Sequence, residues 1–417
     1  MNSNRNPKTV SLWLPCAGGV EALLVDEVAR ITGRSAEAGR GGVWVDGDAV
    51  TAMQLNLESR LAQRVLWPLI DGAYRDEHDL YDMARQVAWL DWITPAQTLR
   101  VDVAAQRSPL QSLNFAALRI KDAVCDVLRD ATGERPSVDT RRPDLALALF
   151  VGAEHATLYV DTSGEALFKR GWRDARGGSQ DVKGEAPLKE TLAAAMLAAA
   201  GWQGRVEDGP LYDPCCGAGT IAIEAAQMAC GIAPGGQRRF AFETLLPFRP
   251  HLNAWSDLQR AARERVHAPS VPIFAGDVSF RMTDFATRNA ERAGVQHAIE
   301  FKTADALQRP PPAAQGTLML NPPYGERLAP KGSGQPAAAA RESFEGGGSS
   351  AEFFSALAGH WKRQYAGWSA WCLSPDMKLP SLMRLKESRR VPMWNGPIEC
   401  RLFRFDMVAG SNKSADA

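Results

Sequence analysis

An apolar run that stops at a polar turn could do chemistry in this sequence. Residues 317–327 read T-L-M-L-N-P-P-Y-G-E-R. Because proline neither donates to a strand ladder nor continues a helix, Pro322 and Pro323 force the chain to turn after a predicted strand. The turn presents the Asn321 amide, main-chain carbonyls and the Tyr324 ring, without a Ser, Cys or His nucleophile.

These groups suit a planar exocyclic amine, whose lone pair is delocalised into its ring. The Asn321 side-chain oxygen and the Pro322 carbonyl can accept hydrogen bonds from the two N–H groups of the amine. These bonds would turn the nitrogen lone pair out of conjugation with the ring. They also stabilise positive charge that develops on nitrogen. Tyr324 can stack on an extruded base, and Pro323 stiffens the turn. The four residues 321–324 are the predicted catalytic set.

Three aspartates stand at the ends of three further predicted strands. Asp213 opens D-P-C-C-G-A-G-T, in which Gly217 and Gly219 allow close approach of a ligand before a helix begins. Asp277 ends the next strand, where an acid usually bonds the hydroxyls of a ribose. Asp305 ends the strand after that and can accept from an adenine amine. Because the first acid suits an amine-bearing ligand, the series predicts S-adenosylmethionine.

The glycine turn differs from the usual phosphate-binding loops. It has neither the G-x-G-x-x-G spacing nor the G-K-[ST] of a P-loop, and an acid precedes it. Cys216 within the turn and Thr220 at the start of the following helix complete the predicted cofactor-binding set. The adjacent thiols Cys215 and Cys216 lack zinc-ligand spacing, so no metal is predicted.

Alternating helical and strand patterns must position these groups. From residue 187 the pattern predicts an α/β fold, a parallel doubly wound sheet with helices on both faces. Its strands are expected at P-L-Y-D-P, 271–277, 299–305 and 317–321. The dipeptide Asn395-Gly396 predicts a closing antiparallel hairpin. Residues 331–350 are of low complexity, which predicts a flexible loop.

The first part of the chain predicts two α+β units, at residues 1–70 and 71–167. The second includes a strand at 99–106 and a strongly amphipathic helix at 115–130. Residues 168–186 are polar and glycine-rich, which is typical of a linker. The remaining residues, 187–417, form the predicted sheet domain.

The composition limits the class of protein. The 417-residue chain is 45% hydrophobic and has zero formal net charge, so no global basic field indicates a nucleic-acid partner. Seven scattered cysteines favour reduced thiols, and the N-terminus lacks an apolar signal segment. The expected location is the cytoplasm, with no membrane contact. The oligomeric state cannot be read from the sequence.

The motifs of the sequence resemble those of a known family. D-P-C-C-G-A-G-T, A-G-D, T-A-D and N-P-P-Y-G-E-R resemble the motifs of class I S-adenosylmethionine-dependent nucleic-acid amino-methyltransferases. Residues 159–173 followed by 186–195 resemble the junction between a THUMP domain and its methyltransferase domain. W-N-G-P-I-E-C-R-L (394–402) resembles the terminal hairpin of the same group.

Nearly the whole chain is similar to bacterial methyltransferases that modify N2 of a guanine in large-subunit ribosomal RNA. The resemblance implies a ferredoxin-like unit over 1–70, a THUMP RNA-binding domain over 71–167 and a Rossmann-like class I methyltransferase domain over 187–417. Some relatives carry a second methyltransferase domain, whereas the motifs occur once here. Residues 331–350 match nothing in the family pattern.

Basic residues supply the predicted RNA contacts. Lys169, Arg170 and Arg173 lie near the domain junction, and Arg327 follows the proline turn. The tail 376–405 has seven Lys or Arg against three acids. Solvated surface is the alternative for each of these residues.

Several functions stay open. The leading one is guanine-N2 methylation of 23S ribosomal RNA, either naked or in a pre-ribosomal particle. The alternatives are the same reaction on tRNA, methylation of DNA adenine or of a protein glutamine, and a non-enzymatic role as an RNA-binding ribosome assembly factor. The N-terminal module disfavours DNA and protein substrates, and the intact motifs disfavour an inactive fold.

Overall fold

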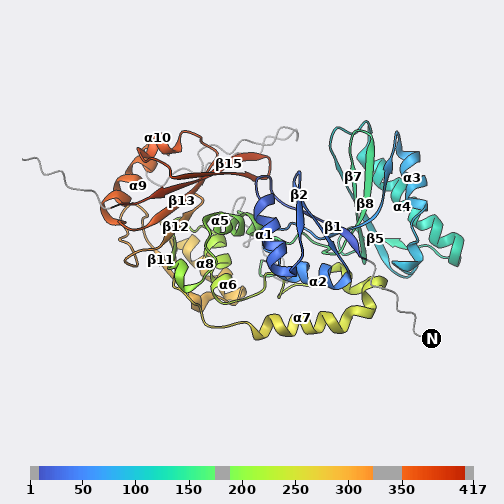
Figure 1. Cartoon of the computed structure of the whole chain (residues 1–417), viewed down its shortest axis with the longest axis horizontal. Helices are drawn as coiled ribbons and strands as arrows, with labels where there is room; N and C mark the ends of the chain where they lie inside the picture. Colours follow the sequence, from blue (N-terminus) through green and yellow to red (C-terminus); the bar gives the residue numbers. More distant parts are fainter. Residues whose placement is uncertain (1–8, 174–187, 323–349, 409–417) are drawn as a thin grey trace, which may run out of the picture. The chain divides into compact units, whose positions relative to one another are not determined.

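The chain folds into two compact units, each described by itself. The computed structural model describes residues 9–173, 188–322 and 350–408. The first unit comprises Met1–Cys16, Val20–Gly171 and Ala233–Arg265, and the second comprises Ala17–Gly19, Trp172–Ile232 and Val266–Ala417 (Figure 1). The chain therefore leaves the first unit near residue 171 and contributes to it once more through residues 233–265.

The first unit is built on one continuous sheet of eight strands, in the order β2-β3-β1-β4-β8-β7-β5-β6. Its elements are β1 (Val10–Pro15), α1 (Glu21–Thr32), β2 (Ala36–Gly39), β3 (Gly42–Gly47), α2 (Ala49–Glu58), β4 (Leu66–Ala73), α3 (Glu77–Arg85), β5 (Thr98–Ala105), α4 (Leu113–Thr132), β6 (Ser137–Val138), β7 (Leu145–Val151) and β8 (His155–Asp161). The first six elements follow the βαββαβ order of a ferredoxin-like fold.

The two α+β units expected from the sequence share one continuous sheet. β4 pairs with β1 at Trp13↔Leu66 and then runs antiparallel to β8 from Leu66↔Asp161 to Ala73↔His155. The expected boundary at residue 70 falls inside β4. An eight-residue strand is long enough to bond to a different neighbour on each side, and sequence periodicity carries no information about strand partners.

Helix α4 illustrates why these residues form these elements. The Ser112 hydroxyl accepts from the Phe115 N–H at the start, and Gly133 ends the helix in the left-handed conformation. Ile120, Val124 and Leu128 recur every four residues and are fully buried. The amphipathic pattern predicted from 115 to 130 is therefore the core-facing side of a longer helix.

Residues 233–265 lie within the span that the sequence assigned to the methyltransferase domain, but they pack in the first unit. They include α7 (Leu252–Glu264). Aromatic rings account for this placement, because Phe248 lies 5.8 Å from Trp67, centroid to centroid, in an edge-on contact. Phe242 is fully buried and packs edge-on against Trp255 of α7.

The second unit has a seven-stranded sheet in the order β11-β10-β9-β12-β13-β15-β14. Its elements are α5 (Glu190–Ala200), β9 (Leu211–Asp213), α6 (Thr220–Ala229), β10 (Ile273–Asp277), α8 (Phe280–Arg292), β11 (Ile299–Thr303), β12 (Thr317–Leu320), α9 (Ser350–Gln364), β13 (Ser369–Ser374), α10 (Leu379–Met383), β14 (Arg389–Asn395) and β15 (Ile398–Asp406). The predicted doubly wound sheet is confirmed: β11, β10, β9, β12 and β13 are parallel, and helices cover both faces (Figure 1).

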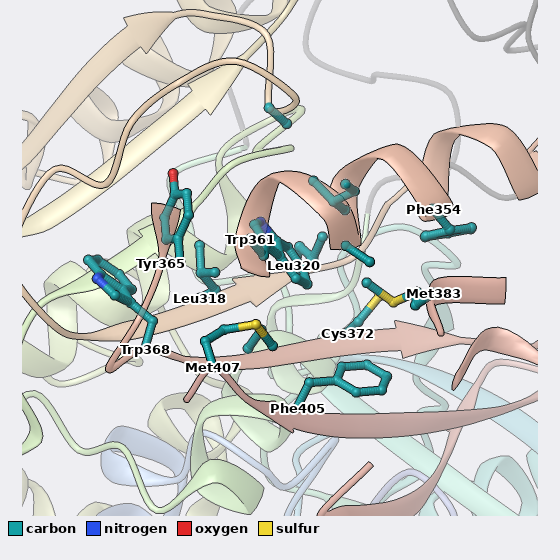
Figure 2. Packing of buried hydrophobic residues seen from close by; sticks show 14 of the residues in the cluster. Leu318, Leu320, Phe354, Trp361, Tyr365, Trp368, Cys372, Met383, Phe405 and Met407 are labelled. Atoms are coloured by element: carbon teal, nitrogen blue, oxygen red, sulfur yellow. The ribbon is translucent and has the colours of Figure 1, made fainter. Parts of the chain in front are cut away.

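The core of this sheet lies beneath α9. Leu318 and Leu320 of β12 point to one face, where they meet Trp361 of α9 together with Cys372 and Phe405 of the neighbouring strands (Figure 2). All residues of β9 and β12 are buried, as expected for central parallel strands covered on both faces. The polar ends of these two strands are therefore held on a rigid, close-packed base.

The closing antiparallel hairpin is confirmed, but its turn lies one residue further on than expected. Asn395 still pairs with Ile398, so the two-residue loop is Gly396-Pro397 and not Asn395-Gly396. Gly396 has φ of +62° at the first loop position. A two-residue turn with glycine there also suits proline at the second position, since that residue needs no ladder N–H.

All seven cysteines lie within the described residues and are free thiols. Across residues 9–173, 188–322 and 350–408, none of the helices is long and apolar enough to cross a membrane.

Candidate active site

The candidate site lies where the strand order of the second sheet reverses. From β9 the chain proceeds outward to β10 and β11, then returns to place β12 on the other side of β9. Because these strands are parallel, their carboxyl ends share one edge, and open α/β sheets bind ligands at such a reversal. Asp213 ends β9 and Asn321 follows β12, so the two side chains stand at adjacent strand ends.

Asp213 is a buried carboxyl group, with 1% of the residue exposed. Its Oδ1 accepts from the N–H of Cys215 at 3.2 Å. Burial raises the pKa of Asp213 well above its usual value, and the negative charge of Asp277 adds to the rise. Ionised Asp213 therefore favours a cation as a neighbour, which the predicted ammonium contact would supply.

The turn after β9 is shaped by glycine. Gly217 has φ of +50°, and a Cβ added there would meet no atom within 4 Å among the described residues. Gly219 has φ of +82°, and its added Cβ would lie 3.0 Å from the Cβ of Ala286. The Cys216 N–H donates to the Gly276 carbonyl at 2.8 Å, which ties the turn to β10. Gly217 thus faces open space, and Gly219 permits close packing on α8.

Asp277 holds two loops together. Its Oδ2 accepts from the Gly217 N–H at 3.0 Å and its Oδ1 accepts from the Ser279 N–H at 3.0 Å. The acid predicted to bind ribose therefore also fixes the glycine turn at the end of the neighbouring strand. Asp213 and Asp277 therefore both accept hydrogen bonds from the main chain of the same glycine turn.

Asp305 lies just beyond β11 and is half-buried. Its Oδ1 accepts from the Leu307 N–H at 2.8 Å, and its Oδ2 accepts from the Gln308 side chain at 3.2 Å. The carboxylate therefore orders its own turn. One carboxylate has several lone-pair directions, so these bonds leave capacity for a further donor.

Thr220 begins α6 directly after the turn and is buried. Among the described residues, no side chain caps this helix at Gly219. Its first-turn N–H groups and the positive end of its dipole are oriented toward the strand edge, which is an environment for a carboxylate or another anion.

Two predicted RNA contacts, buried Arg170 and half-buried Arg173, are bound to partners inside the protein and require correction. The Arg173 guanidinium lies beneath α6, where Nη2 donates to the Thr220 hydroxyl at 2.6 Å and Nε lies 2.7 Å from buried Glu190. Arg170 is 2% exposed and donates to the carbonyls of Leu167 and Arg60. Because both cations serve interior partners, we no longer expect either of them to contact RNA.

Lys169 differs from these arginines. Its side chain is exposed, and its ammonium lies 2.7 Å from a Glu165 carboxylate oxygen in an exposed ion pair. Such pairs are weak and exchange readily with solvent or phosphate. Lys169 therefore stays a predicted RNA contact.

The opening motif is only partly within the described structure. Asn321 is half-buried and Pro322 is buried, directly after the last residue of β12. Pro323, Tyr324 and Arg327 lie outside the described residues, as does the 331–350 segment. Their assigned roles stay predictions from the sequence.

The neighbouring cysteine thiols lie in surroundings that disfavour their ionised form. Burial raises the pKa of both Cys215 and Cys216 well above the usual thiol value, with nearby Asp213 adding to the effect. The described ranges contain no cluster of three or more His, Cys, Asp or Glu side chains arranged to hold a metal ion.

Sequence reasoning overlooked Glu190. This acid is 2% exposed at the start of α5 and pairs with Arg173, which in turn bonds to Thr220 at the candidate site. The available signal was a lone charge at the head of the alanine-rich run E-T-L-A-A-A-M-L-A-A-A, because a buried charge requires a buried partner.

Three family models match successive parts of the chain. They are the RlmL ferredoxin-like domain at residues 11–66, the THUMP domain at 74–161 and the RMKL-like methyltransferase domain at 176–337. Together with the parallel sheet of the second unit, these matches show that the chain is similar to methyltransferases that carry a THUMP domain.

Curated relatives are similar to this chain over almost its whole length. The Ribosomal RNA large subunit methyltransferase K/L of Shewanella sp. (strain W3-18-1) is 34% identical over 404 residues, covering 95% of this chain and 53% of the relative. The chain thus spans about half the length of the curated relatives it matches.

Two solved structures are similar over almost the whole chain. One, assigned as a methyltransferase and crystallised with SAH, has a TM-score of 0.81 and 25% identity, covering 97% of this chain and 100% of its own. A Listeria monocytogenes protein assigned as an N6-adenine-specific DNA methylase has a TM-score of 0.79 and 27% identity, covering 95% and 96% of the two chains.

Proposed function

We propose that this chain transfers a methyl group from S-adenosylmethionine to the exocyclic N2 amine of a guanine in RNA, with large-subunit ribosomal RNA as the substrate. The observation that carries the proposal is the position of Asp213 and Asn321 at the carboxyl ends of two adjacent central strands. A candidate cofactor acid and a candidate amine acceptor then lie at the same edge of the sheet.

The residues at this edge fit the cofactor. Asp213 would hold the ammonium, since its buried carboxylate favours a cation. Gly217 leaves open space beside the strand end. Asp277 and Asp305 would accept from the ribose hydroxyls and the adenine amine. When bound, S-adenosylmethionine supplies a methyl group activated by its sulfonium charge.

The polar turn after β12 would position the acceptor. The Asn321 side-chain oxygen and the Pro322 carbonyl accept hydrogen bonds from the two N–H groups of the guanine amine. These bonds direct the nitrogen lone pair out of conjugation with the ring. Both oxygens also favour the positive charge that grows on nitrogen. From the sequence, Pro323 limits the freedom of the turn and Tyr324 stacks on the extruded base.

The THUMP match supports an RNA substrate, and the name of the Shewanella relative supports large-subunit ribosomal RNA. Lys169 and, from the sequence, Arg327 would contact phosphates, which position an RNA without reading its bases. The same chemistry on tRNA differs only in which RNA the N-terminal unit accepts.

A second candidate is methylation of the N6 amine of adenine in DNA. The assignment of the Listeria structure favours it, and both amines present two N–H bonds to the same acceptors. The THUMP match and the curated relative favour RNA instead.

The experiment is mass mapping of modified nucleosides in a strain that lacks this gene. We expect one N2-methylguanosine to disappear from large-subunit RNA and to return with the wild-type gene. Complementation with Asn321→Ala should not restore it.

Each alternative leaves a different signature in the same samples. Loss of N2-methylguanosine from tRNA would support the tRNA reaction, and loss of N6-methyladenine from DNA would support the second candidate. An unchanged map of RNA and DNA would contradict the proposed function.

A further inference from the structure

Arg309 is a charged residue in the interior of the second unit, six residues after β11. Only 6% of the residue is exposed, although its charge would be costly to bury alone. It lies in the run L-Q-R-P-P-P, four residues beyond Asp305. Its partners come from strands that carry the candidate cofactor residues.

The guanidinium reaches back beneath the strand ends. It lies over the Tyr212 ring, with Cζ 4.7 Å from the ring centroid. Nη1 donates to the Ala275 carbonyl at 3.4 Å, and Nη2 lies 3.2 Å from Glu300 Oε1. Tyr212 belongs to β9, Ala275 to β10 and Glu300 to β11, so one planar cation contacts three adjacent strands.

Glycine makes this approach feasible. A Cβ added to Gly276 would lie 3.2 Å from Tyr212 Oη and 3.3 Å from Arg309 Nη1. Both distances are tight for a carbon atom. The glycine of A-G-D therefore leaves room for the phenol and the guanidinium at the same point, directly before Asp277.

The main chain of Arg309 is fixed as firmly as its side chain. Its N–H donates to the Asp305 carbonyl at 2.9 Å, which closes the turn that carries the predicted adenine acid. Its carbonyl accepts from the Tyr365 hydroxyl at 2.9 Å and from His360 Nε2 at 2.8 Å. Figure 2 shows the Tyr365 hydroxyl pointing out of the hydrophobic cluster.

These contacts converge on the residues beside all three candidate aspartates. Tyr212 precedes Asp213, Ala275 lies two residues before Asp277, and the Arg309 N–H closes the turn of Asp305. We propose that Arg309 is a positioning residue that fixes the spacing of the three cofactor-binding carboxylates. This inference rests on the proposed function, because it assumes that those carboxylates hold S-adenosylmethionine.

The flat shape of the guanidinium is essential to this role. Lysine retains the charge but offers one rotatable ammonium, which cannot stack on Tyr212 and bond to two strands in fixed directions. An arginine that only stabilised the core would affect folding without selectively affecting the cofactor. Positioning predicts weaker cofactor binding with little change in the affinity for RNA.

The test compares SAH binding by wild-type protein, Arg309→Lys and Tyr365→Phe, using isothermal titration, with thermal melting as a check on folding. Tyr365→Phe keeps the ring in the core and removes only the bond to the Arg309 carbonyl. Arg238→Lys is the matched control, because that guanidinium donates to four main-chain carbonyls in the first unit. KM for S-adenosylmethionine, KM for RNA and kcat are measured on the same proteins.

We expect Arg309→Lys to weaken SAH binding about 10-fold and Tyr365→Phe about 3-fold, in line with a lost hydrogen bond or two. KM for S-adenosylmethionine should rise in proportion, with kcat and KM for RNA within about 2-fold of wild type. Arg238→Lys should bind SAH as wild type does. If Arg309→Lys does not fold, the Tyr365→Phe result decides.

Unchanged SAH affinity in folded variants, with wild-type protein binding SAH, would overturn the positioning role and leave the proposed function intact. Equal weakening in Arg238→Lys would also overturn it, because the effect would then follow from general destabilisation. Failure of wild-type protein to bind SAH would overturn the proposed function together with this inference.

Discussion

Asp213 illustrates how burial shapes a candidate binding group. Its carboxyl is removed from water and accepts a main-chain N–H from Cys215, yet its pKa is still raised. Because the folded-state pKa exceeds the ordinary value, the protein without cofactor loses stability as pH rises through that raised pKa. A bound ammonium would favour the ionised carboxylate and so lower the pKa of Asp213.

The first prediction concerns the pH dependence of cofactor binding. Below its raised pKa, Asp213 must release a proton to pair with the ammonium, so SAH affinity should increase with pH from about 4 upward, by at most about 10-fold per pH unit for one proton. The increase should level off above that pKa. Titrations at one pH in buffers with different ionisation enthalpies measure the released proton directly.

Asp213→Asn supplies the control for that measurement. It should bind SAH weakly and release no proton at this position. Affinity that stays flat with pH in wild-type protein, or an equal proton release in the variant, would disprove the ammonium contact.

Sequence patterns could predict the positions of the acids but not the surroundings of the arginines. Asp213 and Asp277 stand at strand ends because an apolar run followed by an acid and a turn marks a strand end. The environment of Arg173 could not be read in the same way. Its partner Glu190 lies on a helix 17 residues along the chain, and local sequence does not reveal that Glu190 is buried and paired with Arg173.

At the scale of elements, the glycine turn links α6 to α8. Gly219 has a left-handed backbone, and its missing Cβ allows contact with Ala286. Gly201 also has a left-handed backbone, with φ of +75° at the end of α5, but an added Cβ there meets none of the described atoms within 4 Å. Substitutions at these two glycines therefore distinguish the cost of backbone strain from the cost of a steric clash.

We predict that Gly219→Ala lowers the free energy of unfolding by about 2 kcal/mol or more, and Gly201→Ala by about 1 kcal/mol. Only Gly219→Ala should also weaken SAH binding, because it displaces the turn at the candidate site. Urea denaturation and SAH titration measure the two effects. Similar losses in both variants would indicate that close packing at Gly219 contributes nothing.

The type and order of elements could be predicted from the sequence, whereas strand partners and exact register could not. The βα alternation after residue 187 fixes a parallel sheet, because parallel strands need crossover helices. Residues 233–265 contain helix α7 but no strand of this alternation, and their place in the first unit depends on aromatic contacts such as Phe248 with Trp67. The hairpin turn shifted by one residue because Pro397 fits the loop and not the ladder.

At the scale of the whole molecule, the proposed function requires the domain composition to direct a general chemistry toward one class of substrate. Under the proposed function the Asn321 turn would suit any planar amine, so we expect substrate choice to come from elsewhere in the chain. Formal net charge is zero, which leaves recognition to local features such as the THUMP-matched region at 74–161. Because the chain spans about half the length of its curated relatives, its activity should be tested on this chain alone.

The most direct measurement is methyl transfer by the purified 417-residue chain. Isotope-labelled S-adenosylmethionine is incubated with large-subunit RNA from the deletion strain, and the nucleosides are separated by mass spectrometry. We expect label in N2-methylguanosine, with Asn321→Ala slower by about 100-fold or more and its SAH affinity within about 2-fold of wild type. Absence of labelled N2-methylguanosine, or full transfer by Asn321→Ala, would contradict the proposed reaction.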